Sequence, residues 1–271
     1  MKIKFCRLCR SKNLETVSSL GKMYFTGIFP KSRNSVIPKG KLKLIRCKKC
    51  ALLQLEDNFD YKLMYGKNYG YMSSLNKAMK FHLKLKKKYL LDTYKVKKGS
   101  SILDIGSNDG TFLNFFSNDY KLFACDPTIK KFKKYYRKDI NTNANFFSTG
   151  HYKNQKFDLI TSIAMFYDLP DPLKFAKDIK SLLSKDGIWH LEMSYMPSML
   201  SNKSYDTICH EHLEYYSLKS LKFLTKLSNL KIVNISFNQI NGGSFSLDIA
   251  KNDSVYSENN TLLKWLLLRE N

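Results

Sequence analysis

Short apolar runs alternate with stretches of helical spacing over the second part of the chain. The runs lie at residues 102–105, 120–125, 157–164, 187–193, 230–237 and 245–250. Alternation of this kind is typical of βαβ units, in which helices cover a mostly parallel sheet. Only residues 238–244 separate the last two runs, too few for a crossover helix, so these runs are predicted to pair as an antiparallel hairpin. The pattern predicts an α/β fold.

A long amphipathic helix is predicted over residues 73–94, before the first of these strands. Its apolar residues fall near helical spacing and alternate with lysines. They are Leu75, Met79, Leu83, Leu90 and Leu91. We expect this helix to lie in a linker between two domains.

The first sixty residues have a different pattern. They hold four of the six cysteines, β-like runs such as residues 41–45, and several glycines and prolines between residues 27 and 40. We therefore expect a small module at residues 1–60 and a helical linker at residues 61–98. The sheet domain should follow at residues 99–251, and a last segment, residues 252–271, should include a helix at 261–269.

The composition is that of an ordinary globular protein, with 43% hydrophobic residues. No segment approaches the roughly 18 consecutive apolar residues that a membrane-spanning helix needs. The first residues run into cysteines rather than into the apolar stretch of a signal peptide. We expect a cytoplasmic protein without a membrane partner.

The chain is strongly basic, with 46 lysines and arginines against 23 aspartates and glutamates. A net charge of +23 favours an anionic partner such as nucleic acid, acidic lipid or a phosphorylated small molecule. The basic residues are mostly lysines scattered over the whole length, without an arginine-rich arm. We therefore favour a compositional lysine bias over a dedicated nucleic-acid surface, and expect no nucleic-acid partner.

Two C-x-x-C pairs bracket the N-terminal module. Cys6 and Cys9 form one pair, and Cys47 and Cys50 form the other. Two such pairs complete a tetrahedral Zn²⁺ site with no open position, which makes the ion structural rather than catalytic. A redox pair, disulfides and an iron–sulfur cluster are the alternatives, and the paired spacing favours zinc.

A glycine turn follows the first strand of the sheet domain. Asp104, Gly106 and Gly110 give the pattern D-x-G-x-x-x-G, with Ser107 inside it. A dinucleotide site requires G-x-G-x-x-G instead, so a nucleoside ligand without a pyrophosphate is indicated. Asp126 ends the next strand, where a carboxylate can accept hydrogen bonds from both ribose hydroxyls. The alternative is that Asp126, before Pro127, only forms a turn; the glycine turn before it and the strand after it favour the nucleoside interpretation.

This arrangement resembles the class I methyltransferases, which use S-adenosylmethionine, over residues 99–251. The resemblance implies a Rossmann-like, mostly parallel seven-stranded sheet with a terminal antiparallel hairpin. It implies that Asp104, Gly106 and Gly110 face the amino-acid end of the cofactor, with Ser107 beside them, and that Asp126 faces the ribose.

A cluster of polar residues, Y-D-x-I-x-H-E-H, follows the strand predicted at residues 187–193. It holds His210, Glu211 and His212 and does not match the H-E-x-x-H pattern of zinc proteases. A neutral imidazole is the commonest general base near neutral pH, and an adjacent carboxylate can fix its tautomer. The alternative is a polar loop whose histidines cap helices or bind buried carbonyls.

This cluster occurs together with the cysteine module, the glycine turn, residues 69–74 and residues 241–244. The combination points to one family within the class I methyltransferases. The chain is similar to sugar C-methyltransferases that act on nucleotide-linked keto-deoxysugars. The resemblance implies that His212 removes the proton next to a ketone, that His210 and Glu211 orient the reacting groups, and that the resulting enolate takes the methyl group. The residues it assigns to the substrate are Tyr69, Tyr71, Cys209 and Gly243.

The chain departs from this family at three places. Cys209 stands where well-known members have tyrosine, and Asp168 stands where some have histidine. Members usually continue into a further C-terminal domain, so residues 252–271 are expected to begin a domain that is missing or truncated. Methylation of oxygen or nitrogen on another small molecule, and cofactor binding without turnover, therefore remain as alternatives.

Overall fold

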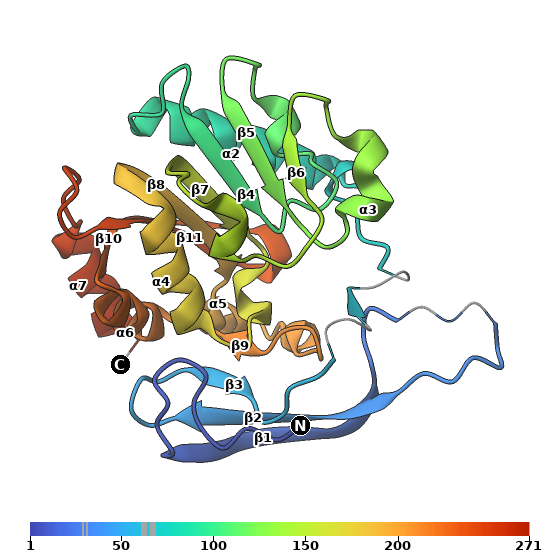
Figure 1. Cartoon of the computed structure of the whole chain (residues 1–271). Coiled ribbons are helices and arrows are strands. Elements are labelled where there is room, and N and C mark those ends of the chain that lie inside the picture. Colours follow the sequence, from blue (N-terminus) through green and yellow to red (C-terminus); the bar gives the residue numbers. More distant parts are fainter. Residues whose placement is uncertain (29, 31, 61–63, 66–68, 271) are drawn as a thin grey trace.

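The computed structural model describes residues 1–28, 30, 32–60, 64–65 and 69–270. Two β-sheets organise this part of the chain, a seven-stranded sheet in the upper part of Figure 1 and a four-stranded sheet below it. Helices of the chain's second half lie between them in this view (Figure 1). The predicted α/β class is confirmed.

The large sheet has the strand order β10-β11-β8-β7-β4-β5-β6. Its strands are β4 (Ser101–Ile105), β5 (Lys121–Cys125), β6 (Asn141–Asn143), β7 (Phe157–Ile163), β8 (Leu183–Ser194), β10 (Leu230–Asn238) and β11 (Ser244–Lys251). The neighbours in the series β8-β7-β4-β5-β6 all pair in parallel, whereas β11 is antiparallel to both β8 and β10. The predicted terminal hairpin is therefore confirmed.

Helices pack on both faces of this sheet. They are α2 (Lys77–Thr93), α3 (Ile129–Phe132), α4 (Pro172–Leu182), α5 (Met196–Ser201), α6 (Leu218–Ser228) and α7 (Asn260–Arg269). Short 3-10 turns lie at η1 (Ser73–Leu75), η2 (Leu113–Phe115), η3 (Lys133–Tyr135), η4 (Thr149–Tyr152), η5 (Phe166–Asp168), η6 (Tyr205–Thr207) and η7 (Ile240–Gly242). Buried apolar residues of α4, α6 and α7 form one core cluster, and those of α2 belong to another.

Helix α2 packs directly against the large sheet. Met79, Leu83 and Leu90 join the apolar cluster on that face. Beside them, the buried Glu192 of β8 binds the His82 ring at 2.5 Å and the Lys86 ammonium at 2.8 Å. The helix that the sequence places in a linker therefore forms part of the layer that covers the sheet.

The small sheet combines three strands of the N-terminal module with one short strand from the second half of the chain. It contains β1 (Leu14–Tyr24), β2 (Lys39–Cys47), β3 (Leu53–Leu55) and β9 (Glu214–Tyr215), in that order. The first two form a long hairpin that extends along the bottom of Figure 1. Strand β9 comes from the chain directly after the histidine cluster, so that cluster is tied to the N-terminal module.

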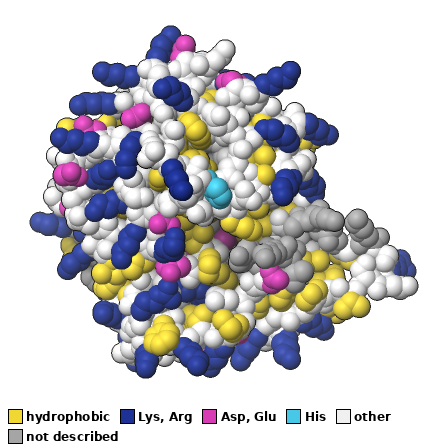
Figure 2. Space-filling view, viewed as in Figure 1, with side chains coloured by type: hydrophobic (Ala, Val, Ile, Leu, Met, Phe, Trp, Pro, Cys, Tyr) yellow, Lys and Arg dark blue, Asp and Glu magenta, His cyan; other side chains and the backbone are white. Residues whose placement is uncertain are grey.

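Basic side chains are spread over the surface. Figure 2 shows lysines and arginines distributed over one whole face rather than gathered in a single stripe. Among the described residues, no helix is both long enough and apolar enough to cross a membrane.

Candidate active site

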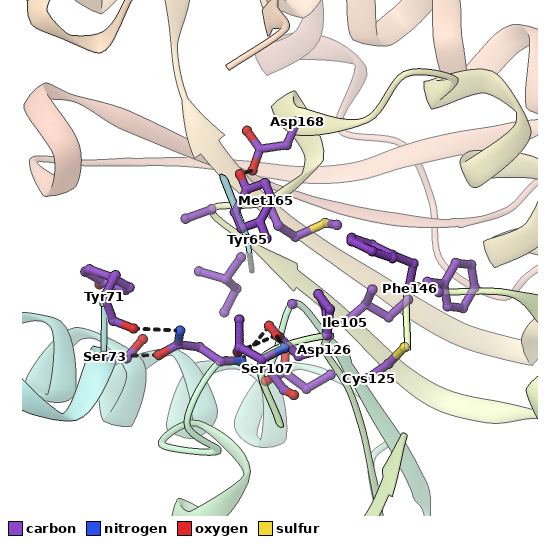
Figure 3. Close-up of a pocket in the computed structure, with 18 of the residues that line it drawn as sticks. Tyr65, Tyr71, Ser73, Ile105, Ser107, Cys125, Asp126, Phe146, Met165 and Asp168 are labelled. Atoms are coloured by element: carbon purple, nitrogen blue, oxygen red, sulfur yellow. Dashed lines mark hydrogen bonds between the residues drawn. The ribbon is translucent and has the colours of Figure 1, made fainter. Parts of the chain in front are cut away.

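A cavity of about 340 Å³ opens where β4, β5 and β7 end at their carboxyl edges. This edge is where open α/β sheets bind their ligands, since loops and helix starts meet there. The wall contains the glycine turn, the end of β5, and the segment after β7 (Figure 3). Four of the five predicted cofactor residues, Asp104, Gly106, Ser107 and Asp126, line this cavity. Gly110 is not among the lining residues, although its neighbour Thr111 is.

Two glycines of the turn have backbones that other residues rarely adopt. Gly106 has φ +79° and Gly110 has φ +77°. A Cβ at Gly106 would lie 2.8 Å from Met165 Cγ, and a Cβ at Gly110 would lie 2.8 Å from the Tyr136 ring. Both conformation and space therefore require glycine, which lets the turn close tightly over the end of the sheet.

Two carboxyl groups lie beneath the turn. Asp104 accepts a hydrogen bond from Thr161 Oγ1 at 2.6 Å, and burial raises the pKa of Asp104 to about 7. Asp126 accepts from the Asn108 backbone N–H at 2.9 Å through Oδ2, and from the Thr128 backbone N–H at 2.7 Å through Oδ1. Burial also raises the pKa of Asp126. The Thr128 hydroxyl also donates to Oδ1, at 2.5 Å, so Oδ1 is fully used within the Asp126–Thr128 turn. Oδ2, which accepts only from Asn108, keeps a lone pair for a ligand hydroxyl.

The segment of residues 69–74 forms a flap on the glycine turn. Asn108 accepts a hydrogen bond from the Ser73 backbone N–H and donates to the Tyr71 carbonyl, both at 3.0 Å. Asp109 accepts from the Ser74 backbone N–H at 3.0 Å. These bonds hold Tyr71 in the cavity wall (Figure 3). Tyr69 also lines the cavity. The sequence reasoning missed Asn108 and Asp109, although they stand inside the turn.

His212 has one tautomer defined by its surroundings. Its Nδ1 lies 2.8 Å from the Thr207 carbonyl oxygen, which can only accept a hydrogen bond. Nδ1 therefore carries the proton, and Nε2, for which the described residues provide no partner, has a free lone pair. The ring packs on Tyr167, with centroids 4.3 Å apart. His212 thus adjoins the cavity wall through Tyr167 and its neighbour Asp168, without lining the cavity itself.

The other residues of the cluster contact the N-terminal module. His210 is fully buried, its ring lies 4.8 Å from those of Phe25 and Phe59, and its Nε2 lies 3.1 Å from the Gly40 carbonyl oxygen. Burial lowers the pKa of His210. Cys209 is also buried and is absent from the described cavity wall. These contacts hold the cluster against β2.

Glu211 lines a second, smaller cavity of about 120 Å³. Tyr65, Asp168 and Pro170 line both cavities, so the two adjoin. Burial raises the pKa of Glu211. Sequence reasoning had no signal for Tyr65, which comes close to Asp168 only through folding.

Gly243 lies away from both cavities. It has φ +114°, and its Cβ position would be 2.9 Å from Ser198 Cβ. Its carbonyl accepts from the Tyr195 backbone N–H at 3.1 Å. The structure therefore places Gly243 at the start of β11 against α5, and its assignment to the substrate stays a prediction.

The four cysteines of the N-terminal module converge. Their sulfur atoms all lie within 4.8 Å of one another, and the Cys6–Cys50 and Cys9–Cys47 sulfur pairs are each 3.5 Å apart. A tetrahedral zinc site with Zn–S bonds near 2.3 Å needs sulfurs about 3.8 Å apart, so this donor set fits Zn²⁺. The hydrogen bond between Cys6 and Cys50 lowers the pKa of Cys6 and raises that of Cys50, because the two sulfurs share one proton.

Two family models match the chain. A model described as "Methyltransferase domain" matches residues 77–235, and one described as "Putative zinc binding domain" matches residues 6–65. Together they cover the glycine turn, the histidine cluster and the four cysteines.

Curated relatives match more loosely. The C-methyltransferase NovU of Streptomyces niveus is 24% identical over 209 residues, which are 75% of this chain and 50% of NovU. The tRNA U34 carboxymethyltransferase of Campylobacter lari is 30% identical over 128 residues, 41% of this chain and 43% of that enzyme. The chain thus spans half or less of the length of these relatives.

Solved structures share the fold. A chain from the complex of the Haloferax volcanii Trm112 methyltransferase activator with a methyltransferase superposes with a TM-score of 0.53 at 14% identity, covering 66% of this chain and 95% of its own. The plantazolicin methyltransferase BpumL, in complex with a pentazolic desmethylPZN analog and SAH, superposes with a TM-score of 0.51 at 15% identity, covering 65% of this chain and 86% of its own.

Proposed function

Because this chain belongs to the methyltransferase domain family and uses S-adenosylmethionine together with a structural zinc ion, we propose that it methylates the carbon next to the ketone of a nucleotide-linked keto-deoxysugar. The observation that carries this proposal is the tautomer of His212. Its Nδ1–H is held by the Thr207 carbonyl, so the Nε2 lone pair is available to remove a proton.

The cofactor would lie in the large cavity. The tight backbone of the glycine turn would face its amino-acid end, and Asp126 would accept hydrogen bonds from its ribose hydroxyls. When bound, S-adenosylmethionine supplies an electrophilic methyl group on a sulfonium sulfur. Tyr69 and Tyr71, held over the turn, would exclude water from that end of the cavity.

Proton removal at carbon is the step assigned to His212. The C–H bond next to the ketone breaks, its proton moves to Nε2, and its electron pair forms a carbon–carbon double bond while the carbonyl π pair moves onto oxygen. Bound S-adenosylmethionine would supply the methyl group to the enolate carbon: the new carbon–carbon bond would form as the methyl–sulfur bond breaks, with its electron pair left on sulfur, and the ketone would re-form. Glu211, beside His212, would stabilise the imidazolium, and His210 would hold the cluster against β2.

Methylation of oxygen or nitrogen is the alternative reaction, in which the same imidazole would deprotonate a heteroatom. The similarity to a C-methyltransferase over 75% of the chain supports carbon as the acceptor. The similarity to tRNA-modifying enzymes is confined to 41% of the chain. The scattered basic surface suits the phosphates of a nucleotide-linked donor (Figure 2).

The site of methylation can be read from the product. The zinc-replete protein would be incubated with nucleotide-linked keto-deoxysugars and cofactor carrying a ¹³C-labelled methyl group, and the product examined by carbon NMR. We expect the label on a ring carbon, coupled to the neighbouring carbon of a ¹³C-labelled sugar. Label on oxygen or nitrogen would refute the proposed reaction.

Asp126→Ala is expected to weaken binding of S-adenosylmethionine and of its demethylated product. A hydrogen bond to a charged group contributes about 1.5–3 kcal/mol, which corresponds to a loss of affinity of about 10–100-fold, measured by calorimetry. Asp139→Ala is the control, because Asp139 pairs with Arg137 on the surface. Equal affinity in both variants would remove Asp126 from the cofactor site.

A further inference from the structure

The proposed enolate needs a hydrogen-bond donor at its oxygen. Removal of the α proton places negative charge on that oxygen, and one well-placed donor in an enclosed site contributes about 10²–10³-fold to the rate. His212 cannot act both as the base and as this donor, because its Nδ1–H is already bonded to Thr207. The donor must come from another group near His212 and the cofactor cavity.

Asp168 occupies such a position. It ends η5, the short turn after β7, and lines the large cavity (Figure 3). It also lines the small cavity. Its Oδ2 accepts a hydrogen bond from the Tyr65 hydroxyl at 2.5 Å. Its Oδ1 is buried and has no hydrogen-bond partner among the described residues. A buried oxygen without a partner is costly unless a ligand satisfies it.

The groups around Asp168 oppose its ionisation. Burial raises its pKa to about 8, with smaller increases from Cys209 and Glu211, while His212 and the Tyr65 hydroxyl act in the opposite direction. Tyr69, Tyr167, Glu214 and Tyr215 are also close enough to interact electrostatically with it. The carboxyl is therefore largely neutral near pH 7. Because Oδ2 already accepts from Tyr65, the proton resides on Oδ1.

We propose that Asp168, as a neutral carboxylic acid, donates a hydrogen bond from Oδ1 to the ketone oxygen of the acceptor and stabilises its enolate. This inference rests on the proposed function. The acid proton stays on Asp168 while the α proton goes to His212 Nε2. The charge that develops on oxygen is met by a donor rather than by a second negative charge.

Two substitutions distinguish a donor from a carboxylate. In Asp168→Asn, the amide nitrogen can still donate at the Oδ1 position while its oxygen accepts from Tyr65, so exchange of the α proton should stay within about tenfold of wild type. In Asp168→Leu the donor is lost, and exchange should fall by about 10²–10³-fold. The control is Asp178→Asn, whose carboxylate pairs with Lys174 on α4.

The pH profile provides a second readout. Since the acid form is present below its raised pKa, wild-type exchange should decline as the pH rises through about 8. Asp168→Asn should lack this alkaline decline. Infrared difference spectra of wild type against this variant, without substrate, should show a protonated carboxyl band below that pH and its loss above it.

These experiments distinguish failure of the Asp168 role from failure of the proposed function. If wild type exchanges the proton and Asp168→Leu does so equally fast, or if Asp168→Asn is as impaired as Asp168→Leu, the donor role of Asp168 is refuted while the proposed function stands. Absence of the protonated carboxyl band refutes it as well. If wild type exchanges no proton with any nucleotide-linked keto-deoxysugar, the proposed function fails, and the role of Asp168 fails with it.

Discussion

His212→Asn is expected to lower methyl transfer by about 10²–10⁴-fold, the usual contribution of a general base. Asparagine can still donate to the Thr207 carbonyl, but it has no basic nitrogen to replace Nε2. His212 does not line the cavity in which the cofactor would bind. The affinity for S-adenosylmethionine should therefore stay within about twofold of wild type.

The matched control for His212→Asn is His151→Asn. His151 is an exposed residue of η4, outside the lining of both cavities, and its replacement should leave turnover unchanged. Turnover would be measured with saturating cofactor, and cofactor affinity separately by calorimetry. A normal turnover in His212→Asn would exclude this histidine from the mechanism.

Cys6→Ser is expected to release the zinc ion and to abolish turnover while sparing most of the cofactor affinity. Structural zinc contributes about 10–16 kcal/mol to the folding of small zinc domains, so loss of one thiolate should unfold the N-terminal module. Apart from residues 65 and 69–73, the wall of the cofactor cavity comes mainly from the ends of β4, β5 and β7 and the segments that follow them, on the other sheet. It should therefore survive.

The route from the zinc site to His212 is short. Gln54 of β3 donates to Cys6 Sγ at 3.4 Å and stands opposite Glu214 of β9. The Leu55 backbone N–H donates to the Leu213 carbonyl at 2.9 Å, one residue after His212. Loss of the metal should loosen β3 and, with it, the loop that holds the base.

Hydrogen exchange followed by mass spectrometry would test this coupling. In Cys6→Ser, residues 209–216 should exchange faster together with residues 53–55, whereas β4 and β5 should stay protected. Chelation of zinc from wild type, followed by its return, serves as a reversible control. Unchanged protection at residues 209–216 in a protein that has lost its zinc would contradict the coupling.

Much of the large sheet was predictable because its strands are apolar and its βα units are local. The glycine turn was predictable for the same reason, since Asp104, Gly106 and Gly110 are close in the sequence. Strand β6 has the polar sequence Asn-Thr-Asn and lies at the edge of the sheet, so no apolar run predicted it. Strand β8 begins at Leu183, before the predicted start at residue 187, and Gly187 lies inside it.

The contacts between distant segments could not be predicted. Strand β9 has two residues, and it is a strand only because β3 is there to pair with it. The bond between Tyr65 and Asp168 joins residues 103 positions apart, and no sequence pattern around Tyr65 relates it to Asp168. The sequence grouped His210 with His212, but His210 packs on Phe25 of the N-terminal module, whereas His212 packs on Tyr167 beside the cavity wall.

Deuterium exchange at the α carbon is the most direct test of an enolate mechanism. Wild-type protein would be incubated in heavy water with a nucleotide-linked keto-deoxysugar and the demethylated cofactor, so that no methyl group can be transferred. We predict deuterium at the carbon next to the ketone with wild type and none with His212→Asn. Methyl transfer by wild type to the same sugar, without any deuterium at that carbon, would contradict the mechanism.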